Sequence, residues 1–267
     1  MDYLKRGEVK ISTGGYLREV LDDFPEEITG REETLAATHL FKVRSGEDQV
    51  FLDEPSACTF HHSVAQLLFT STRCRKDIRT EVAFLTTREK APDEDDGKKL
   101  RQLSQHVKCT IRMPLILSAD SLNVTKWWVV ASYTSYDDRR GYNGSTMSLG
   151  RGSVISISKK KKLNTKSSTE AELIGADDML PQMLWTKYFI ETQGYGIDEN
   201  IMYKDNLSAM LLETSRNKSS TKKMKHIQVR YFLIKDRVAT CDVELKHYST
   251  TKMLADHFAK PLQGGLL

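Results

Sequence analysis

The sequence predicts a mixed α/β fold, in which a sheet is covered by helices and preceded by a largely helical region. After about residue 120, apolar runs and helical stretches follow in the order strand, strand, strand, helix, strand, helix, helix, strand, helix. This order is typical of a mixed sheet with helices on its faces. Short, turn-rich links join the first three strands, which favours an antiparallel meander. Before residue 120, helical patterns flank an irregular, charged stretch.

The first helices and strands are expected from local patterns. The helices predicted in the first part are residues 15–24, 63–87 and 98–107. In the second part, residues 127–131 (WWVVA) form an apolar run that suits a buried strand. Strands at 146–149 and 154–157 follow across the turn-forming residues Gly144 and 150–152, because glycines between apolar runs mark turns.

A long helix is expected from residue 167 to about residue 192. Thr169 and Glu172 have the spacing of a capping box at its start, and Pro181 should kink or divide it. The remaining predicted elements are a strand at 201–204, helices at 206–213 and 225–238, a strand at 243–248, and a last helical turn or two at 253–259.

The composition excludes several classes of protein. The 267 residues are 39% hydrophobic and 28% charged, which argues against a wholly disordered, collagen-like or disulfide-scaffold chain. No apolar run approaches the roughly 20 residues of a membrane span, and the first residues lack the apolar core of a secretory signal. We therefore expect an intracellular protein, cytoplasmic or nuclear, with no membrane partner and with free thiols at its four cysteines.

Basic residues gather in the second half of the chain. Residues 159–162 are four consecutive lysines, and residues 216–237 carry eight Lys and Arg against Asp236 alone. Such clusters are usually solvated surfaces, but they also bind the phosphate backbone of nucleic acids. The candidate nucleic-acid-binding residues are Lys159, Lys160, Lys161, Lys162, Lys222, Lys223 and Lys225.

Three acids lie at the ends of predicted elements, where they could meet at one edge of the sheet. Glu172 is in the first turn of the long helix, Asp205 ends a short strand, and Asp256 is in the last helical segment. Carboxylates are the ligands that Mg²⁺ prefers, and two such ions can promote cleavage of a phosphodiester. Each acid also has an ordinary interpretation, as a capping-box acid, a helix cap and a solvated helix acid respectively.

Four blocks of this sequence resemble, in order, the signature blocks of the ribonuclease H domain of copia-type LTR retrotransposons. The blocks are residues 167–173 (SSTEAEL), 203–209 (YKDNLSA), 225–231 (KHIQVRY) and 254–262 (LADHFAKPL). Residues 61–68 and 75–78 are similar to the reverse transcriptase segment beyond its palm, and residues 7–17 to the end of the palm. The resemblance therefore covers nearly the whole chain.

The resemblance implies a carboxy-terminal piece of a retrotransposon polyprotein. Residues 1–119 would be a remnant of the reverse transcriptase palm end, thumb and connection, residues 120–262 a ribonuclease H-like mixed sheet with flanking helices, and residues 263–267 a tail. No paired aspartates precede residue 7, where the resemblance places the metal site of the palm. We therefore expect no polymerase active site in this chain, and the missing polymerase portion is a candidate partner.

The resemblance also implies a catalytic site. Glu172, Asp205 and Asp256 would be three of four catalytic carboxylates that bind Mg²⁺. The position matching the fourth is Val130, and a valine cannot ligate a cation. Asp137 and Asp138, in the turn after the strand, are the candidate substitutes. Other departures from the family pattern, at Leu35, Gly97 and Cys109, suggest drift in a decaying element copy.

Three functions are therefore considered. The first is a fragment that binds RNA–DNA hybrid, or other nucleic acid, with nuclease activity weak or lost because Val130 replaces a carboxylate. The second is an active Mg²⁺-dependent ribonuclease H that cleaves the RNA strand of the hybrid. The third is a non-catalytic packing module.

Overall fold

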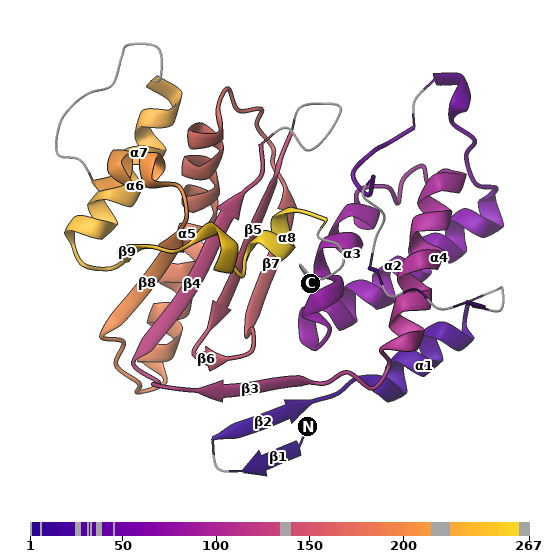
Figure 1. The fold of residues 1–267 in the computed structure, drawn as a ribbon, viewed down its shortest axis with the longest axis horizontal. Coiled ribbons are helices and arrows are strands. Elements are labelled where there is room, and N and C mark those ends of the chain that lie inside the picture. The colour runs from indigo at the N-terminus through magenta and orange to yellow at the C-terminus, as the bar shows by residue number, and fades with distance from the viewer. Residues whose placement is uncertain are drawn as a thin grey trace.

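The computed structural model describes residues 2–5, 7–24, 28–30, 32, 34–35, 39–44, 46–133, 140–214 and 225–261. Within these ranges the chain forms a helical part and a sheet part, which lie side by side with a small second sheet beneath them (Figure 1). The mixed α/β class predicted from the sequence is confirmed. None of the helices in these ranges is long and apolar enough to cross a bilayer.

The sheet part is built on five strands in the order β7-β5-β4-β8-β9. β4 (Val124–Ala131), β5 (Tyr142–Ser148) and β7 (Ile155–Lys160) form the predicted antiparallel meander. β8 (Glu199–Lys204) pairs parallel to β4, and β9 (Glu244–His247) pairs parallel to β8. The carboxyl ends of β4, β8 and β9 therefore lie at the same edge of the sheet.

Helices cover the two faces of this sheet differently. The long α5 (Ser168–Thr192) lies on one face with α6 (Leu207–Thr214) and α7 (Lys225–Ala239) beside it, and the short α8 (Asp256–Ala259), after a 3-10 turn at Thr250–Lys252, lies on the other (Figure 1). Successive strand residues point to opposite faces. On β4, Trp127 and Val129 accordingly pack in the core with α5, while Trp128 and Val130 pack with the α8 segment. α5 runs through Pro181 as one helix, so the predicted division does not occur.

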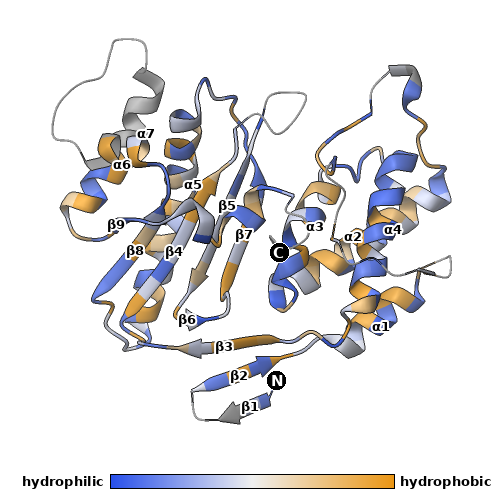
Figure 2. Cartoon of the chain, in the orientation of Figure 1, coloured by the Kyte–Doolittle hydropathy of each residue, from blue (hydrophilic) through white to orange (hydrophobic). Residues whose placement is uncertain are grey.

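The helical part has its own apolar core. Its α-helices are α1 (Gly14–Asp22), α2 (Glu54–Arg73), α3 (Arg79–Thr86) and α4 (Glu94–Cys109), with 3-10 turns at Gly46–Asp48 and Lys76–Ile78. Leu17, Val64, Val82 and Leu103 are among its buried members, and Figure 2 shows hydrophobic residues where α2, α3 and α4 meet.

The single helix predicted over residues 63–87 is wrong. The chain leaves the helical conformation at Cys74 and Arg75, where φ and ψ of Arg75 are −88° and 69°. The Arg75 side chain is 1% exposed and donates to the Asp77 carboxylate and to the Thr110 carbonyl and hydroxyl groups. This polar network fixes the Arg75 side chain between Asp77 and the end of α4.

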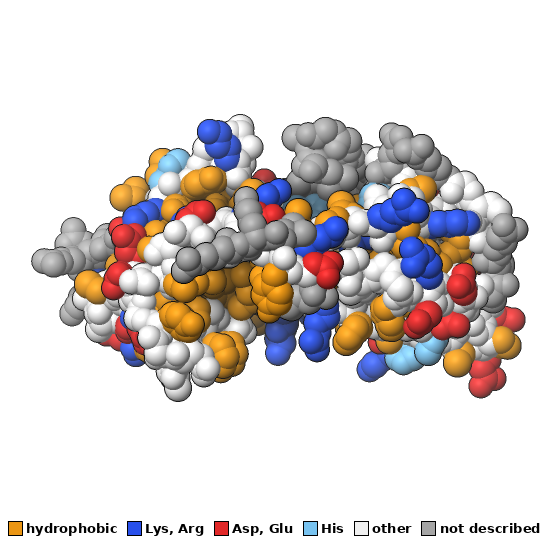
Figure 3. Space-filling view, turned by 90° about the horizontal axis from the view of Figure 1, so that it is seen from below, with side chains coloured by type: hydrophobic (Ala, Val, Ile, Leu, Met, Phe, Trp, Pro, Cys, Tyr) orange, Lys and Arg blue, Asp and Glu red, His pale blue; other side chains and the backbone are white. Residues whose placement is uncertain are grey.

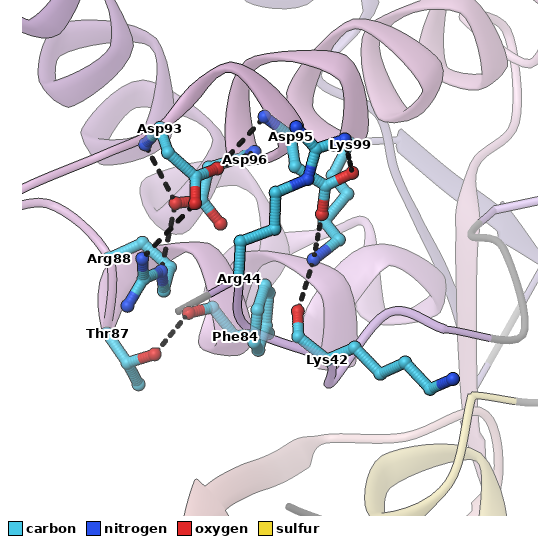
Figure 4. Close-up of polar contacts among 9 residues, drawn as sticks. All are labelled: Lys42, Arg44, Phe84, Thr87, Arg88, Asp93, Asp95, Asp96 and Lys99. Carbon is cyan, nitrogen blue, oxygen red and sulfur yellow. Dashed lines mark hydrogen bonds and ion pairs between the residues drawn. The ribbon is translucent and has the colours of Figure 1, made fainter. Parts of the chain in front are cut away.

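A capping box starts α4 at Glu94 rather than at residue 98. The Asp93 carboxylate accepts hydrogen bonds from the backbone N–H groups of Asp95 and Asp96, both at 2.9 Å, and Asp96 Oδ2 accepts from the Asp93 N–H at 3.1 Å. Arg88 donates to Asp96 at 2.9 Å, and Lys99 pairs with Asp95 at 2.9 Å (Figure 4). The acidic first turn is thus satisfied by backbone donors and by nearby cations.

The sequence did not predict the small second sheet, in which β1 (Asp2–Lys5), β2 (Glu8–Ile11), β3 (Leu115–Ala119) and β6 (Gly150–Arg151) are antiparallel neighbours. Gly152 follows β6 with φ of +78°, and a Cβ there would collide with the Ile116 carbonyl. Glycine allows this close approach of two backbones.

The helical and sheet parts are joined by direct contacts at α8. The Thr80 hydroxyl donates to the His257 carbonyl at 2.6 Å, and His257 Nε2 lies 2.6 Å from the Asp77 carbonyl oxygen. Tyr142 of β5 extends into the helical core, where its ring stacks on Phe41 with centroids 4.6 Å apart. α3 therefore supports the face of the sheet that carries α8.

Candidate functional site at one edge of the sheet

The start of α5 places Glu172 against the central strand. Ser167 is the cap residue, because its hydroxyl accepts from the Glu170 N–H at 3.1 Å, and Glu170 Oε2 accepts from the Lys166 N–H at 2.8 Å. The predicted capping box of Thr169 and Glu172 is therefore wrong. Glu170, not Glu172, is the acid of this cap, and the Glu172 side chain turns toward β4, where it accepts from the Ala131 N–H.

The Glu172 carboxyl is buried beside the end of β4. The residue is 5% exposed, and its Oε1 accepts from the Ala131 N–H at 2.8 Å. Its Oε2 has no hydrogen-bond partner among the residues that the structure describes. Burial raises the pKa of Glu172 to about 7, and the negative charge of Asp205 adds to this, while Lys204, the Ala131 amide and Lys161 oppose it. A carboxylate in this setting needs positive charge nearby.

Two buried lysines supply that positive charge. Lys204, the last residue of β8, is 0% exposed, and its Nζ donates to the Glu172 backbone carbonyl at 3.2 Å. Lys161, directly after β7, is 2% exposed, and its Nζ donates to the Ser132 carbonyl at 2.8 Å. Burial lowers the pKa of Lys161 to about 8, and the charges of Glu172 and Asp178 oppose that shift.

Lys161 and Lys204 are interior residues that the sequence analysis does not predict. The lysine run predicts a surface position for Lys161, but its ammonium lies inside the protein. For Lys204, the position on the strand carries a signal. Met202, two residues earlier on the same strand, belongs to the core with α5, so the alternation of strand residues places Lys204 on the same buried face.

The three predicted metal ligands do not form one group. Asp205, half-buried just after β8, acts on Glu172 through its charge. Asp256 begins α8, on the face of the sheet opposite α5, and its carboxylate pairs with Lys260 Nζ at 2.9 Å. In the described part of the chain, no three His, Cys, Asp or Glu side chains form a group that could hold a metal ion.

Val130 lies on β4 directly before Ala131, whose N–H bonds to Glu172. It is 2% exposed on β4, opposite Gly144 of β5, and packs in the cluster that contains Ala255 and Ala259. Its side chain offers only hydrocarbon. Asp137 and Asp138, the candidate substitutes, lie outside the described residues. With two buried lysines acting electrostatically on Glu172 and with Asp256 paired with a lysine, the described residues do not fit a two-metal site.

Of the candidate nucleic-acid-binding lysines, the structure describes the side chains of residues 159–162 only. Lys159 and Lys162 are exposed and Lys160 is half-buried. Lys222 and Lys223 lie outside the described residues, as does the side chain of Lys225, which begins α7. On the face seen from below, Lys and Arg side chains are spread over the middle and the helical half, and hydrophobic side chains gather over the sheet half (Figure 3).

Comparison with solved structures finds only partial backbone similarity. The N-terminal RNase H domain of Rv2228c from Mycobacterium tuberculosis, solved as a fusion with maltose-binding protein, aligns with 51% of this chain and 90% of its own at 11% identity and a TM-score of 0.37. The foamy viral protease-reverse transcriptase, solved in complex with RNA/DNA hybrid, aligns with 94% of this chain and 28% of its own at 11% identity and a TM-score of 0.44. No family model matches the sequence.

Comparison with curated sequences finds relatives of one kind. The retrovirus-related Pol polyprotein from transposon TNT 1-94 of Nicotiana tabacum is 24% identical over 201 residues, which are 75% of this chain and 15% of the relative. Those from transposons RE1 and RE2 of Arabidopsis thaliana are 28% and 27% identical over 202 residues, again 75% of this chain and 13% and 14% of the relatives. This chain thus spans a small fraction of the length of the relatives it matches. It is homologous to the retrovirus-related Pol polyproteins of copia-type plant transposons.

Proposed function

We propose that residues 120–262 are a ribonuclease H-like unit of a retrotransposon polyprotein, preceded in residues 1–119 by a reverse transcriptase remnant. The unit binds RNA–DNA hybrid, and its nuclease activity is weak or lost. The observation that carries this proposal is Val130, a buried hydrocarbon side chain on the central strand, next to the edge where Glu172 and Asp205 interact. Without an oxygen ligand at this position, we expect Mg²⁺ to bind weakly.

Homology to Pol polyproteins and the exposed lysines support nucleic-acid binding. Lys159 and Lys162 lie around the end of β7, at the same edge of the sheet as Glu172 and Lys204. Ammonium groups on flexible stems bind phosphates without reading base sequence. Each lysine that contacts a phosphate releases a counterion, so affinity falls as salt rises.

Hybrid binding is tested by fluorescence anisotropy at several salt concentrations. We expect Lys159→Gln/Lys162→Gln to weaken binding and to flatten the slope of log affinity against log salt. Lys90→Gln/Lys98→Gln is the matched control, because both residues are exposed on the helical part, and it should leave the slope nearly unchanged. If both double variants lose the same amount of affinity, Lys159 and Lys162 are not the hybrid-binding surface. If the parent protein does not bind hybrid at all, the non-catalytic packing module is the function that remains.

Nuclease activity is tested by adding Mg²⁺ to a labelled hybrid. The parent protein should cleave the RNA strand barely above background, whereas Val130→Asp should cleave measurably faster, because it adds a carboxylate at the central strand. Val130→Asn has nearly the same shape without the charge and should show no gain. Circular dichroism checks that each variant is folded, since a buried polar group is costly. Rapid cleavage by the parent would favour the active ribonuclease H, and a folded but silent Val130→Asp would contradict the role given to position 130.

A further inference from the structure

We propose that Lys161 and Lys204 form a built-in cationic pair that neutralises the Glu172 edge of the sheet, in place of a divalent cation. This inference rests on the proposed function, because it concerns the same edge. It explains how a buried acid persists in a site whose remaining residues do not fit a metal ion. It also assigns a role to two buried lysines that neither hybrid binding nor cleavage requires.

The first step is the location of the two ammonium groups. Lys204 and Lys161 are 0% and 2% exposed, and a cation so far from water costs several kcal/mol unless negative charge lies nearby. Their bonds to the carbonyls of Glu172 and Ser132 satisfy hydrogen-bonding capacity. Those carbonyls are neutral and carry no charge that would balance an ammonium group.

The second step is the source of that negative charge. Glu172 is 5% exposed, and both Lys161 and Lys204 act on it electrostatically. Asp205 and Asp178 add negative charge closer to the surface, where Asp178 also accepts a bond from Asn143 at 2.8 Å. The bonds of Lys204 to the Glu172 carbonyl, of Lys161 to the Ser132 carbonyl and of the Ala131 N–H to Glu172 Oε1 place both ammonium groups in one buried cluster with the Glu172 carboxyl.

The third step is the geometry of the edge. Lys161 follows β7, Lys204 ends β8, and Glu172 comes from the first turns of α5. The lysines bond to carbonyls on different elements, one after β4 and one in α5. The pair therefore ties together the ends of three strands and the start of a helix. Both ammonium groups would repel a divalent cation at this edge, which weakens Mg²⁺ binding further, beyond the effect of the missing ligand at Val130.

Thermal unfolding with and without Mg²⁺ tests the proposal by a measurement that does not depend on nuclease activity. The parent protein should show no rise in Tm with millimolar Mg²⁺. Lys204→Met keeps the unbranched stem and removes the charge, so its Tm should fall by several degrees and recover in part when Mg²⁺ is added. Lys161→Met should behave in the same way and provides a second reading if Lys204→Met does not fold.

A double variant separates charge from packing. In Lys204→Met/Glu172→Gln the anion is removed together with the cation, so its Tm should lie above that of Lys204→Met and should not respond to Mg²⁺. Lys187→Met is the matched control, because Lys187 is a half-buried lysine paired with Asp242 at 3.1 Å, away from this edge. It should lose some stability without gaining a Mg²⁺ response.

Several results would overturn the cationic pair. If Mg²⁺ raises the Tm of the parent protein as much as that of Lys204→Met, the parent already has a metal site. If Lys204→Met and the double variant have equal Tm values, the lysine acts through packing and not through its charge. A parent that is stabilised by Mg²⁺ but does not cleave hybrid contradicts this inference alone. A parent that cleaves hybrid without any Mg²⁺ effect on Tm contradicts the proposed function alone.

Discussion

Glu81 illustrates how one buried acid sets the response of this protein to pH. It lies in α3, is 3% exposed, and its Oε2 has no hydrogen-bond partner in the part of the chain that the structure describes. Burial raises the pKa of Glu81 from an ordinary 4.5 to about 8, and the charge of Asp77 adds to this, while a backbone hydrogen bond opposes it. The folded protein therefore holds this carboxyl in its neutral form well above the pH at which the unfolded chain ionises it.

The sign of the resulting pH dependence follows from proton counting. Between about pH 4.5 and about pH 8 the folded state keeps a proton that the unfolded state has released. The free energy of unfolding therefore falls as pH rises through this window, by at most about 1.4 kcal/mol per pH unit from this group. Glu81→Gln should remove that part of the slope and become the more stable protein at pH 8.

Urea unfolding of the parent and of Glu81→Gln at pH 5 and pH 8 measures the effect. Glu191→Gln, at an exposed position of α5, is the control for the simple loss of a surface charge. If Glu81→Gln and the parent lose stability equally between the two pH values, Glu81 is not the neutral buried acid described above.

At the scale of the element, Gly97 and Gly175, two glycines within the helices α4 and α5, should respond oppositely to a methyl group. A Cβ on Gly97 in α4 would lie 3.8 Å from Leu52 Cδ2, an ordinary contact beside a cavity of about 540 Å³ that Leu52 also lines. Gly97→Ala should therefore raise the free energy of unfolding by about 0.5–1 kcal/mol, because alanine restricts the unfolded chain and favours the helix.

Gly175 in α5 is the matched control for that change. A Cβ there would approach Ala131 Cβ to 2.9 Å, too close without a shift of helix against strand. Gly175→Ala should therefore destabilise the protein although it too replaces glycine in a helix. Equal gains from both substitutions in chemical denaturation would contradict the close contact of α5 with β4.

Elements were predictable from sequence where the pattern was local, and less so where it depended on distant partners. The strand at 127–131, the meander and the long helix follow from apolar runs and turns, and the structure has them as β4, β5, β7 and α5. The break near Arg75 depends on Thr110, and β2 of the small sheet depends on β3, whose paired residues lie more than a hundred positions away. No local pattern reports such contacts.

The same limit applies to the candidate site. The position of Asp205 after a strand, and of Glu172 in an early helical turn, could be predicted, because each depends on nearby residues. That Lys161 and Lys204 turn inward depends on the packing of α5 against the sheet. A run of four lysines gives no local sign that Lys161 is buried, because such a run is usually a solvated surface.

For the molecule as a whole, the contacts of α8 with α3 should make the two parts unfold together. The hydroxyl of Thr80, which is fully buried, donates to the His257 carbonyl 177 residues away. Thr80→Val keeps the shape and leaves that carbonyl without its donor, which costs about 1–3 kcal/mol for a buried group. Besides the loss in unfolding free energy, amide hydrogen exchange in α8 should become faster.

Thr186→Val tests whether that loss belongs to the junction. Thr186 is also buried, but its hydroxyl bonds at 2.8 Å to the Gln182 carbonyl within its own helix. Its replacement should change stability less and leave exchange in α8 unaltered. Equal exchange rates for α8 in the parent and Thr80→Val would mean that the helical part does not hold α8 in place.

The small sheet also dictates an order of events while the chain is being made. β2 pairs with β3 through Glu8 opposite Ser118, and β3 pairs with β6 through Ala119 opposite Gly150. Partners so distant in sequence close large loops, and their pairing is slow beside local helix formation. A ribosome releases the amino end first. One edge of β2 is therefore unpaired until β3 has emerged, and the other edge of β3 is unpaired until β6 has emerged. Until then each nascent chain carries an unpaired strand edge, a kind of surface through which chains aggregate and which chaperones shield.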